Sequence, residues 1–462
     1  MRLRCKGGAL DLWSATDVEY DRSLPSVVSG IVSSVGMETI EAYLGRKHEE
    51  IRLLNGCLRS PRHVPCPRSV DEVIAAKFQL AAALRAEHEL ADWKATETSW
   101  SATARPTSGP FAFSYDYQRA DLKVSGPSFY EDARGCTSEA IYTASGMAAI
   151  AALLLASARL VTTGDIVVLP GSYGETLELI ERFVPHLRLV TIKPPLAAMP
   201  VAAGSPRILL LDSCVSAGAF EAALRCDGSA LDLLIFDTTC FAGRSGRIRR
   251  VLRWARRYQI PVVMVRSHTK LDSLGAEYGR LGSAVFVRWS EEGAERSLAE
   301  RLAAETCDAV RLLGGAALPA HFPPFVGSSA YWGLTKRRVA AILRNGRHAA
   351  RHFARELASL AAELHFTHGL YVTLRPSRPL DEAGARQAAE AMSHDLSRAG
   401  FPIRHAGSFG FDFAATEWFH NATTDEYSVR VAVPDLPTEL WNDLAAAIAQ
   451  WWVAHQAELG EV

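Results

Sequence analysis

Six short and almost wholly apolar runs, all between residues 166 and 287, constrain the fold more than any other feature of this sequence. They are Ile166–Leu169, Leu187–Ile192, Ile208–Leu211, Leu231–Phe236, Val262–Val265 and Ala284–Val287. From about residue 139 onward, these runs alternate with apolar stretches of helical spacing. Strands without polar alternation are typical of a sheet that is covered on both faces. The sequence therefore predicts an α/β fold with a mostly parallel central sheet flanked by helices.

The rest of the chain indicates two further parts. Residues 36–56 and 69–94 have helical spacing, whereas residues 100–128, rich in Ser, Thr, Pro and Gly, indicate an irregular connection. After Pro319–Pro324 come a basic helix pattern, short strand-like runs and a final helix from about residue 436 to 458. We expect an N-terminal helical extension (1–105), a large α/β domain (106–320) and a smaller C-terminal α+β domain (321–462).

Composition excludes several classes of function. The 50 basic and 51 acidic residues give a net charge of −1, and no basic run indicates a nucleic-acid partner. The eight cysteines are scattered singly, which favours reduced thiols over a disulfide scaffold or a metal site. No stretch resembles a signal peptide or a membrane span. We expect a cytoplasmic protein with no metal and no membrane partner.

Ligands of open parallel sheets bind beyond the carboxyl ends of the strands, so the residues that follow each strand deserve the closest inspection. After the fifth run comes Arg266-Ser267-His268-Thr269-Lys270. A lysine that is buried at a strand end is a nucleophilic amine, able to form an imine with an aldehyde. Ser267 and Thr269 lie on one side of this segment and could both donate to a phosphate. A surface lysine in a loop is the plainer interpretation of Lys270 when it is considered alone.

Three other strand ends carry polar or glycine-rich segments. Asp237 follows the fourth run and could pair with the pyridine nitrogen of pyridoxal 5'-phosphate (PLP), although an Asp in this position is often a helix cap. Ser145-Gly146-Met147 opens an apolar helix over residues 147–158 and offers backbone N–H groups to a phosphate, or simply an ordinary N-cap. Tyr173 follows the first run between two glycines, where it could stack on a planar cofactor or pack under the loop.

The order of these segments is more specific than any one of them. Ser-Gly-Met-Ala-Ala-Ile (145–150), Tyr-Gly-x-Thr (173–176), a strand-end Asp and Ser-x-Thr-Lys (267–270) occur in succession. This series resembles the Cys/Met-metabolism family of fold-type I PLP enzymes, which includes cystathionine γ-synthase, cystathionine lyases and methionine γ-lyase. The resemblance is strongest over about residues 129–282. Farther along, Gly407–Gly410 resembles the family's S-L-G segment, and Tyr427–Val433 resembles the strand that carries its substrate-binding arginine.

The resemblance implies PLP as the cofactor and a role for each matching residue. Ser145, Gly146, Met147, Ser267 and Thr269 would hold the phosphate, and Asp237 would pair with the pyridine nitrogen with Thr239 nearby. Tyr173 would stack on the ring and assist proton transfer. Lys270 would form a Schiff base and later move protons, while Ser408 and Arg430 would bind the substrate, the arginine through its α-carboxylate.

Three departures from the family pattern bear on the site. The family's E-S-P-x-N-P segment is Asp212–Ala217 here, so Ser216 would replace the asparagine that contacts the cofactor's 3'-oxygen. The family's Y-S-R motif, which reaches a neighbouring subunit's phosphate, has Tyr117 and Arg119 as its best counterparts. The sequence before residue 105 is also atypical. These departures favour a specialised reaction, such as one in a natural-product pathway.

The resemblance implies elimination or replacement at Cγ or Cβ of an L-amino acid, such as a homoserine ester, cystathionine, methionine or S-adenosylmethionine. The partners would be this substrate and a second small-molecule nucleophile, and a variant reaction would form a carbon–carbon bond. Two alternatives stay open: an aminotransferase or decarboxylase on the same fold, and an inactive homologue that acts as a binding protein. By analogy with the family, we expect a homodimer or homotetramer.

Overall fold

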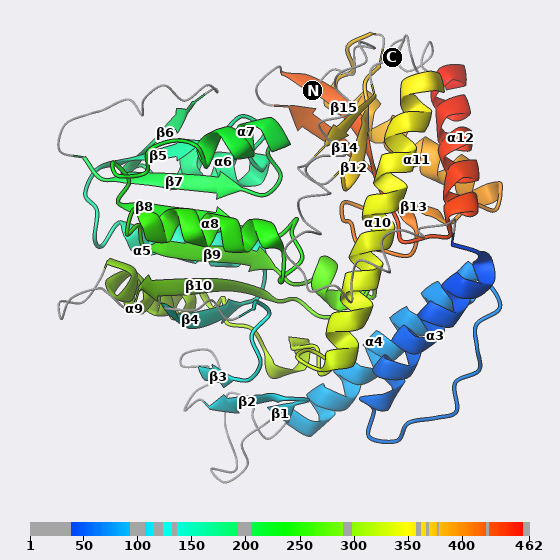
Figure 1. Ribbon diagram of the computed structural model, residues 1–462, viewed down its shortest axis with the longest axis horizontal. Coiled ribbons are helices and arrows are strands. Elements are labelled where there is room, and N and C mark those ends of the chain that lie inside the picture. The colour runs from blue at the N-terminus through cyan, green and yellow to red at the C-terminus, as the bar shows by residue number, and fades with distance from the viewer. Residues whose placement is uncertain are drawn as a thin grey trace.

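The computed structural model contains a seven-stranded sheet, a five-stranded sheet and an N-terminal helical hairpin (Figure 1). It describes residues 38–92, 107–114, 123–131, 136–192, 205–289, 298–356, 362–365, 369–376, 378–421 and 425–455. The domain boundary predicted at residue 105 lies outside these ranges, and both predicted boundaries stay predictions.

All six apolar runs form strands of the larger sheet, which confirms the predicted fold class. Its strands are β4 (Cys136–Thr143), β5 (Gly164–Val168), β6 (Leu187–Thr191), β7 (Arg207–Asp212), β8 (Leu233–Asp237), β9 (Val262–Ser267) and β10 (Gly282–Trp289). They lie in the order β4-β10-β9-β8-β7-β5-β6. The strands from β9 to β6 are parallel, and β10 is antiparallel to both its neighbours. The sheet is therefore mostly parallel, as expected.

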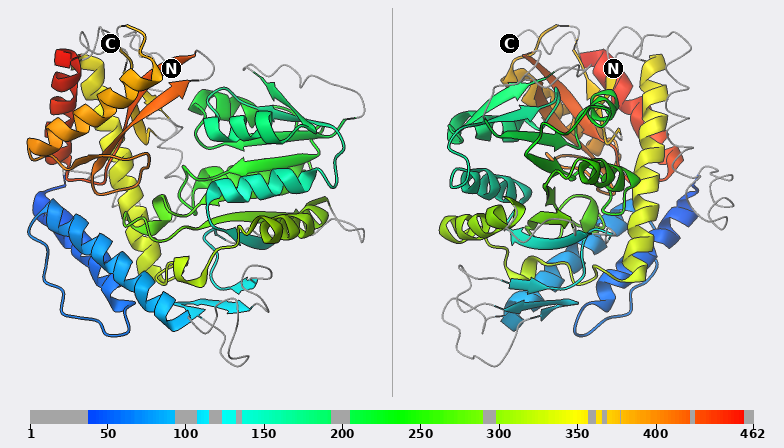
Figure 2. Two further views of the ribbon diagram at one scale, coloured as in Figure 1. Left: turned by 180° about the vertical axis from the view of Figure 1, so that it is seen from behind. Right: turned by 60° about the vertical axis from the view of Figure 1, so that its left-hand side comes forward.

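Helices cover both faces of this sheet, which explains why its strands lack polar alternation (Figure 2). One face packs against α7 (Ala217–Ala223) and α8 (Gly246–Arg257), where Phe220 and Val251 are fully buried. The other face packs against α5 (Gly146–Ser157), α6 (Gly174–Phe183) and α9 (Leu298–Leu313). Consecutive strand residues such as Leu234 and Ile235 belong to opposite cores, because side chains alternate along a strand.

The smaller sheet forms the predicted α+β part. Its strands are β11 (Ala362–His365), β12 (Tyr371–Leu374), β13 (Ile403–His405), β14 (Ala414–Asn421) and β15 (Glu426–Ala432), in the order β11-β12-β15-β14-β13. It packs with α11 (Glu382–Arg398), α12 (Thr438–His455) and the long helix α10 (Ser329–Glu356) around buried Trp441 and Trp452. In Figure 1, α10 runs beside both sheets and joins the two parts.

In the N-terminal half, the two predicted helices are present, but a small sheet was missed. The expected helices are α3 (Ile40–Gly56) and α4 (Val70–Asp92). The stretch 100–128 was wrongly interpreted as entirely irregular, because it contains the small sheet of β1 (Thr107–Ser108), β2 (Phe111–Ser114) and β3 (Lys123–Ser125). Its strands are held by tertiary contacts, with Phe111 and Phe113 packed against Phe322, so local composition could not reveal them.

Candidate active site

The predicted strand-end residues meet at one edge of the larger sheet. Strand β4 has the same direction as β9, because β10 is antiparallel to both. The carboxyl ends of β4, β5, β7, β8 and β9 therefore share one edge, the position at which open α/β sheets bind ligands. Ser145, Tyr173, Asp212, Asp237 and Lys270 each lie in or directly after the end of one of these strands.

Lys270 lies in a turn between β9 and a short 3-10 helix, η2 (Leu271–Ser273), and it is half-buried. Its ammonium Nζ donates a hydrogen bond to the Ser408 hydroxyl at 2.8 Å, although the two residues are 138 positions apart. Burial lowers the pKa of Lys270, and the carboxylates of Glu277 and Glu417 oppose this shift only in part. The amine is therefore more readily deprotonated, and more nucleophilic, than that of a surface lysine.

A buried charged network fixes the turn that carries Lys270. The Arg266 guanidinium donates to both carboxylate oxygens of Asp272, at 2.6 and 2.8 Å. His268 bridges the same Asp272 and the hydroxyl of Ser283, each at 2.8 Å. Burial by itself would raise the pKa of Asp272, but the charge of Arg266 outweighs this effect and lowers the pKa to about 2. Sequence reasoning assigned no role to these residues, which hold the backbone on both sides of Lys270.

The N-terminus of α5 provides a place for an anion beside Lys270. Ser145 caps the helix, its hydroxyl accepting from the Ala148 amide at 3.0 Å, and the amides of Gly146 and Met147 belong to the first turn, where N–H groups lack an intrahelical acceptor. A Cβ atom on Gly146 would lie 3.0 Å from Cβ of Ser267. One on Gly282 would lie 2.2 Å from the carbonyl carbon of Ser145, so both glycines permit this close approach.

Ser267 lies against this helix terminus, and its hydroxyl is adjacent to that of Thr269. The two hydroxyls lie 3.0 Å apart, at hydrogen-bonding distance from each other. Together with the helix dipole and the first-turn amides, two adjacent hydroxyls form a suitable set of donors for a phosphate.

Asp237 and Asp212 form a pair of carboxylates at the ends of neighbouring parallel strands. The two are register partners between β7 and β8. Burial, and then the charge of Asp212, raise the pKa of Asp237 to about 7, even though one of its oxygens accepts from the Thr239 amide at 2.7 Å. The Thr239 hydroxyl in turn accepts from the Ser267 amide at 3.1 Å. A cationic group beside Asp237 would relieve this repulsion.

Tyr173 is positioned by the other member of this carboxylate pair. Its backbone amide donates to Asp212 at 2.9 Å, and the second oxygen of Asp212 accepts from the Cys214 amide at 2.9 Å. The Tyr173 side chain is 37% exposed, and burial together with the Glu175 carboxylate raises the pKa of its phenol. The phenol is therefore protonated at neutral pH, like that of an ordinary tyrosine, and is a weaker acid than one in water. Asp212 is a site residue whose role the sequence did not reveal.

Arg430 of β15 already has a carboxylate partner. It donates to Glu417 of the neighbouring strand β14 at 2.8 Å, and both side chains are largely buried. Its guanidinium lies over the rings of Phe419 and Tyr371, at 4.1 and 4.6 Å from their centroids. The charges of both members of the pair contribute to the shift in the pKa of Tyr173, so the pair lies within electrostatic range of that phenol. Glu417 was missed because only strand register brings it opposite Arg430.

The remaining predicted site residues are less informative. Ser216 caps α7, with its hydroxyl accepting from the Ala219 amide at 3.2 Å, and its contact with the cofactor stays a prediction. Tyr117 and Arg119 lie outside the described residues.

The residues at this edge fit PLP by charge and by shape. The α5 terminus, with Ser267 and Thr269, suits the phosphate. The carboxyl of Asp237, whose pKa is raised, would gain a cationic partner in a protonated ring nitrogen. The amine of Lys270 can react with the aldehyde. A ligand that carries all three groups would engage three strand ends at once.

Other ligand types find less support in the described ranges. No group of three or more His, Cys, Asp or Glu side chains within them could hold a metal ion. None of the described helices is both long and apolar enough to span a membrane. A cavity of about 990 Å³ lies between β3 and the edge strand β4, with Tyr130, Arg244 and Trp332 in its wall, but it contains none of the predicted site residues. We favour the sheet edge as the ligand site, because the chemical groups converge there.

Comparisons with known proteins give only distant likenesses. No family model and no curated protein matches the sequence. Among solved structures, the chain is similar to cystathionine gamma synthase from Xanthomonas oryzae pv. oryzae in complex with aminoacrylate and cysteine, with 17% identity and a TM-score of 0.44. The same enzyme in complex with cystathionine gives 18% identity and a TM-score of 0.44. Both alignments cover 68% of this chain and 82% of the other.

Proposed function

We propose that this chain is a PLP-dependent enzyme of fold type I, with Lys270 as the residue that binds the cofactor covalently. The observation that carries the proposal is the meeting, at one sheet edge, of a half-buried amine, a carboxyl of raised pKa and a helix N-terminus with two hydroxyls. When bound, PLP stabilises the carbanion that forms when Cα of an amino acid loses a proton or another substituent.

The protein's own residues divide the remaining work. Asp237 would keep the cofactor's ring nitrogen protonated, and the α5 terminus with Ser267 and Thr269 would hold its phosphate. Lys270, kept in place by its hydrogen bond to Ser408, would remove a proton from Cα of the substrate and return it at a neighbouring carbon. Arg430 would orient the substrate through its carboxylate.

We further propose that the reaction is elimination or replacement at Cγ or Cβ. The structural support is the position of Tyr173, whose amide donates to Asp212 beside Asp237, so that its phenol could give a proton to a leaving group. The substrate class would be L-amino acids with such a leaving group, including homoserine derivatives, cystathionine, methionine and S-adenosylmethionine. We also propose that the enzyme works in a specialised pathway and uses a second small-molecule nucleophile, which in one variant would form a carbon–carbon bond. The chain would assemble into a homodimer or homotetramer.

The cofactor assignment is tested by borohydride reduction of the full chain mixed with PLP. We expect a stable pyridoxyl label on the peptide that contains Lys270, and no such label in Lys270→Ala. Labelling of other lysines alone would reject the assignment and favour an inactive binding protein.

The reaction type is tested by following a panel of L-amino acids with NMR in deuterium oxide. Exchange at Cβ together with loss of the γ-substituent would support γ chemistry, and exchange at Cα with loss of a β-substituent would support β chemistry. Stoichiometric conversion of PLP to pyridoxamine phosphate without loss of a substituent would instead indicate an aminotransferase.

A further inference from the structure

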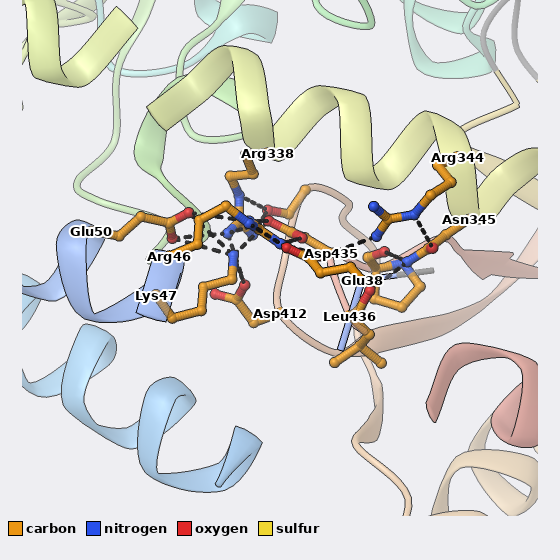
Figure 3. A network of polar contacts seen from close by, with 12 residues as sticks. Glu38, Arg46, Lys47, Glu50, Arg338, Arg344, Asn345, Asp412, Asp435 and Leu436 are labelled. Atoms are coloured by element: carbon orange, nitrogen blue, oxygen red, sulfur yellow. Dashed lines mark hydrogen bonds and ion pairs between the residues drawn. The ribbon is translucent and has the colours of Figure 1, made fainter. Parts of the chain in front are cut away.

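A buried cluster of charges joins the N-terminal hairpin to α10 and the smaller sheet of the C-terminal part (Figure 3). We call the following seven residues the charge cluster: Arg46, Lys47 and Glu50 of α3, Lys77 of α4, Arg338 of α10, Asp412 before β14 and Asp435 after β15. Each of these side chains is at most 7% exposed. Neither catalysis nor cofactor binding, as described above, uses them.

Each lysine of the hairpin binds carboxylates from more than one part of the chain. Lys47 Nζ lies 2.5 Å from Asp435 and 2.6 Å from Asp412. Lys77 Nζ lies 2.6 Å from the other oxygen of Asp412 and also contacts Glu50. Since a buried charge without its partner is strongly unfavourable, these contacts permit one placement of the hairpin and disfavour sliding. An apolar contact of the same size would tolerate small displacements more easily.

Arg338 connects the charge cluster to the segment that leads to the active site. Its guanidinium donates to Asp412 at 2.8 Å and to the carbonyl oxygen of Gly410 at 2.5 Å. The Asp435 amide also donates to the carbonyl oxygen of Phe411 at 2.9 Å. The segment from Ser408 to Asp412 is therefore held at its far end by both charged and backbone contacts.

The near end of the same segment touches Lys270. The Ser408 hydroxyl accepts from Lys270 Nζ at 2.8 Å. Gly410 has a φ of +92°, a conformation that favours glycine, and a Cβ atom there would lie 3.2 Å from the carbonyl oxygen of Lys270. The five-residue segment from Ser408 to Asp412 thus links a buried ionic anchor to the amine on which the proposed chemistry depends.

We propose that the α3–α4 hairpin is a positioning element of the active site, in which Lys47 and Lys77 hold Asp412 and so keep Ser408 and Gly410 against Lys270. The consequence for catalysis rests on the proposed function, but the mechanical link can be measured without it. The hairpin acts through the 408–412 segment and touches neither substrate nor cofactor.

The test compares Lys77→Met with the control Arg337→Gln in the full-length chain. Lys77→Met removes one anchor of Asp412, whereas Arg337→Gln removes an exposed ion pair with Glu49 that also ties the hairpin, through α3, to α10 without reaching the segment. The first readout is hydrogen exchange of the amides of residues 406–413 in cofactor-free protein. We expect exchange about tenfold faster in Lys77→Met and unchanged exchange in the control.

The second readout is the pH midpoint of the visible absorbance of PLP bound to the protein. We expect this midpoint to move in Lys77→Met and not in Arg337→Gln, because the Ser408 contact to Lys270 is loosened. Leu84→Ala, which weakens α4 in an apolar core away from Asp412, separates a local effect from general loss of stability. It should leave both readouts unchanged relative to the control.

Several outcomes would overturn the proposal. One is a folded Lys77→Met protein with wild-type exchange and absorbance midpoint, and another is an equal change in Leu84→Ala. If Lys77→Met does not fold, the charge-balanced variant Lys77→Met/Asp412→Asn replaces it with the same expectations. Failure of both to fold would show that the cluster serves folding as a whole. Absence of PLP binding in the wild type would reject the proposed function but leave the exchange result to decide the mechanical link.

Discussion

Replacing Asp237 by Asn should make the cofactor-free protein more stable, although it removes a residue that the proposed function requires. In the folded chain, burial and the Asp212 carboxylate raise the pKa of Asp237 to about 7, compared with about 3.9 in an unfolded chain. Between these two values the native state binds more protons than the unfolded state, so the contribution of Asp237 to stability falls as the pH rises. Above the folded pKa, the full cost of its buried charge is present.

The size of this cost follows from the shift. A difference of about three pKa units corresponds to about 4 kcal/mol at 1.36 kcal/mol per unit. Asparagine keeps an oxygen that can accept from the Thr239 amide, and it relieves Asp212 of the neighbouring charge. Since the amide is still a buried polar group, we expect a net gain of about 2–4 kcal/mol at pH 8 and almost none at pH 4.

Urea unfolding of the cofactor-free, full-length protein at several pH values measures this gain. Asp443→Asn, an exposed aspartate of α12, is the matched control and should change stability at neither pH. With PLP present, we expect the advantage of Asp237→Asn to shrink or reverse, because the wild-type carboxylate then has a cationic partner. A gain of equal size at pH 4 and pH 8, or a loss at pH 8, would refute the electrostatic reasoning.

Three further predictions concern the lysine, the arginine pair and the helix terminus. Ser408→Ala should lower the pKa of Lys270 further, because the hydroxyl accepts from the protonated amine; the pH dependence of reductive labelling by pyridoxal measures this, and an unchanged midpoint would contradict it. Glu417→Gln should tighten binding of an amino-acid carboxylate about tenfold, since it removes the carboxylate charge that competes for the Arg430 guanidinium, at a stability cost of about 1–3 kcal/mol; weaker binding in a titration would instead make Glu417 a substrate contact. Gly282→Ala should lower affinity for PLP and destabilise the protein by about 1–3 kcal/mol, because its Cβ would collide with the backbone of Ser145; Gly174→Ala, where a Cβ meets nothing within 4 Å, is the control.

The sequence predicted the larger sheet well because each of its inner strands carries its own signal. Buried strands such as Leu233–Asp237 are apolar up to their last residue, and no distant residue is needed to recognise them. The edge strand β4 was not predicted, since four of its eight residues are exposed and its first half is polar. Its pairing with β10, rather than its own composition, makes it a strand.

The residues of the candidate site also fall into two groups, those that the sequence could identify and those that it could not. Lys270, Asp237 and Tyr173 could be selected because each follows a recognisable strand, whereas Glu417 gains its position only from the register between β14 and β15. Lys47 and Lys77 lie on helices whose polar residues resemble a solvated face. They are buried because their partners, Asp412 and Asp435, come from parts of the chain more than 330 residues away. No local pattern could pair them.

The separation along the chain between the members of the charge cluster also sets an order for folding. Arg46 and Lys47 bind Asp435, 389 and 388 residues later, so the hairpin cannot reach its final contacts until residue 435 has been synthesised. During that wait part of its inner face, at Arg46, Lys47, Glu50 and Lys77, presents charges to water beside apolar residues such as Leu54 and Leu84. An apolar face in the same position would stay exposed for the whole of translation and would invite aggregation. Lysine and glutamate therefore reduce the apolar surface that this hairpin exposes until the segment after β15 is made.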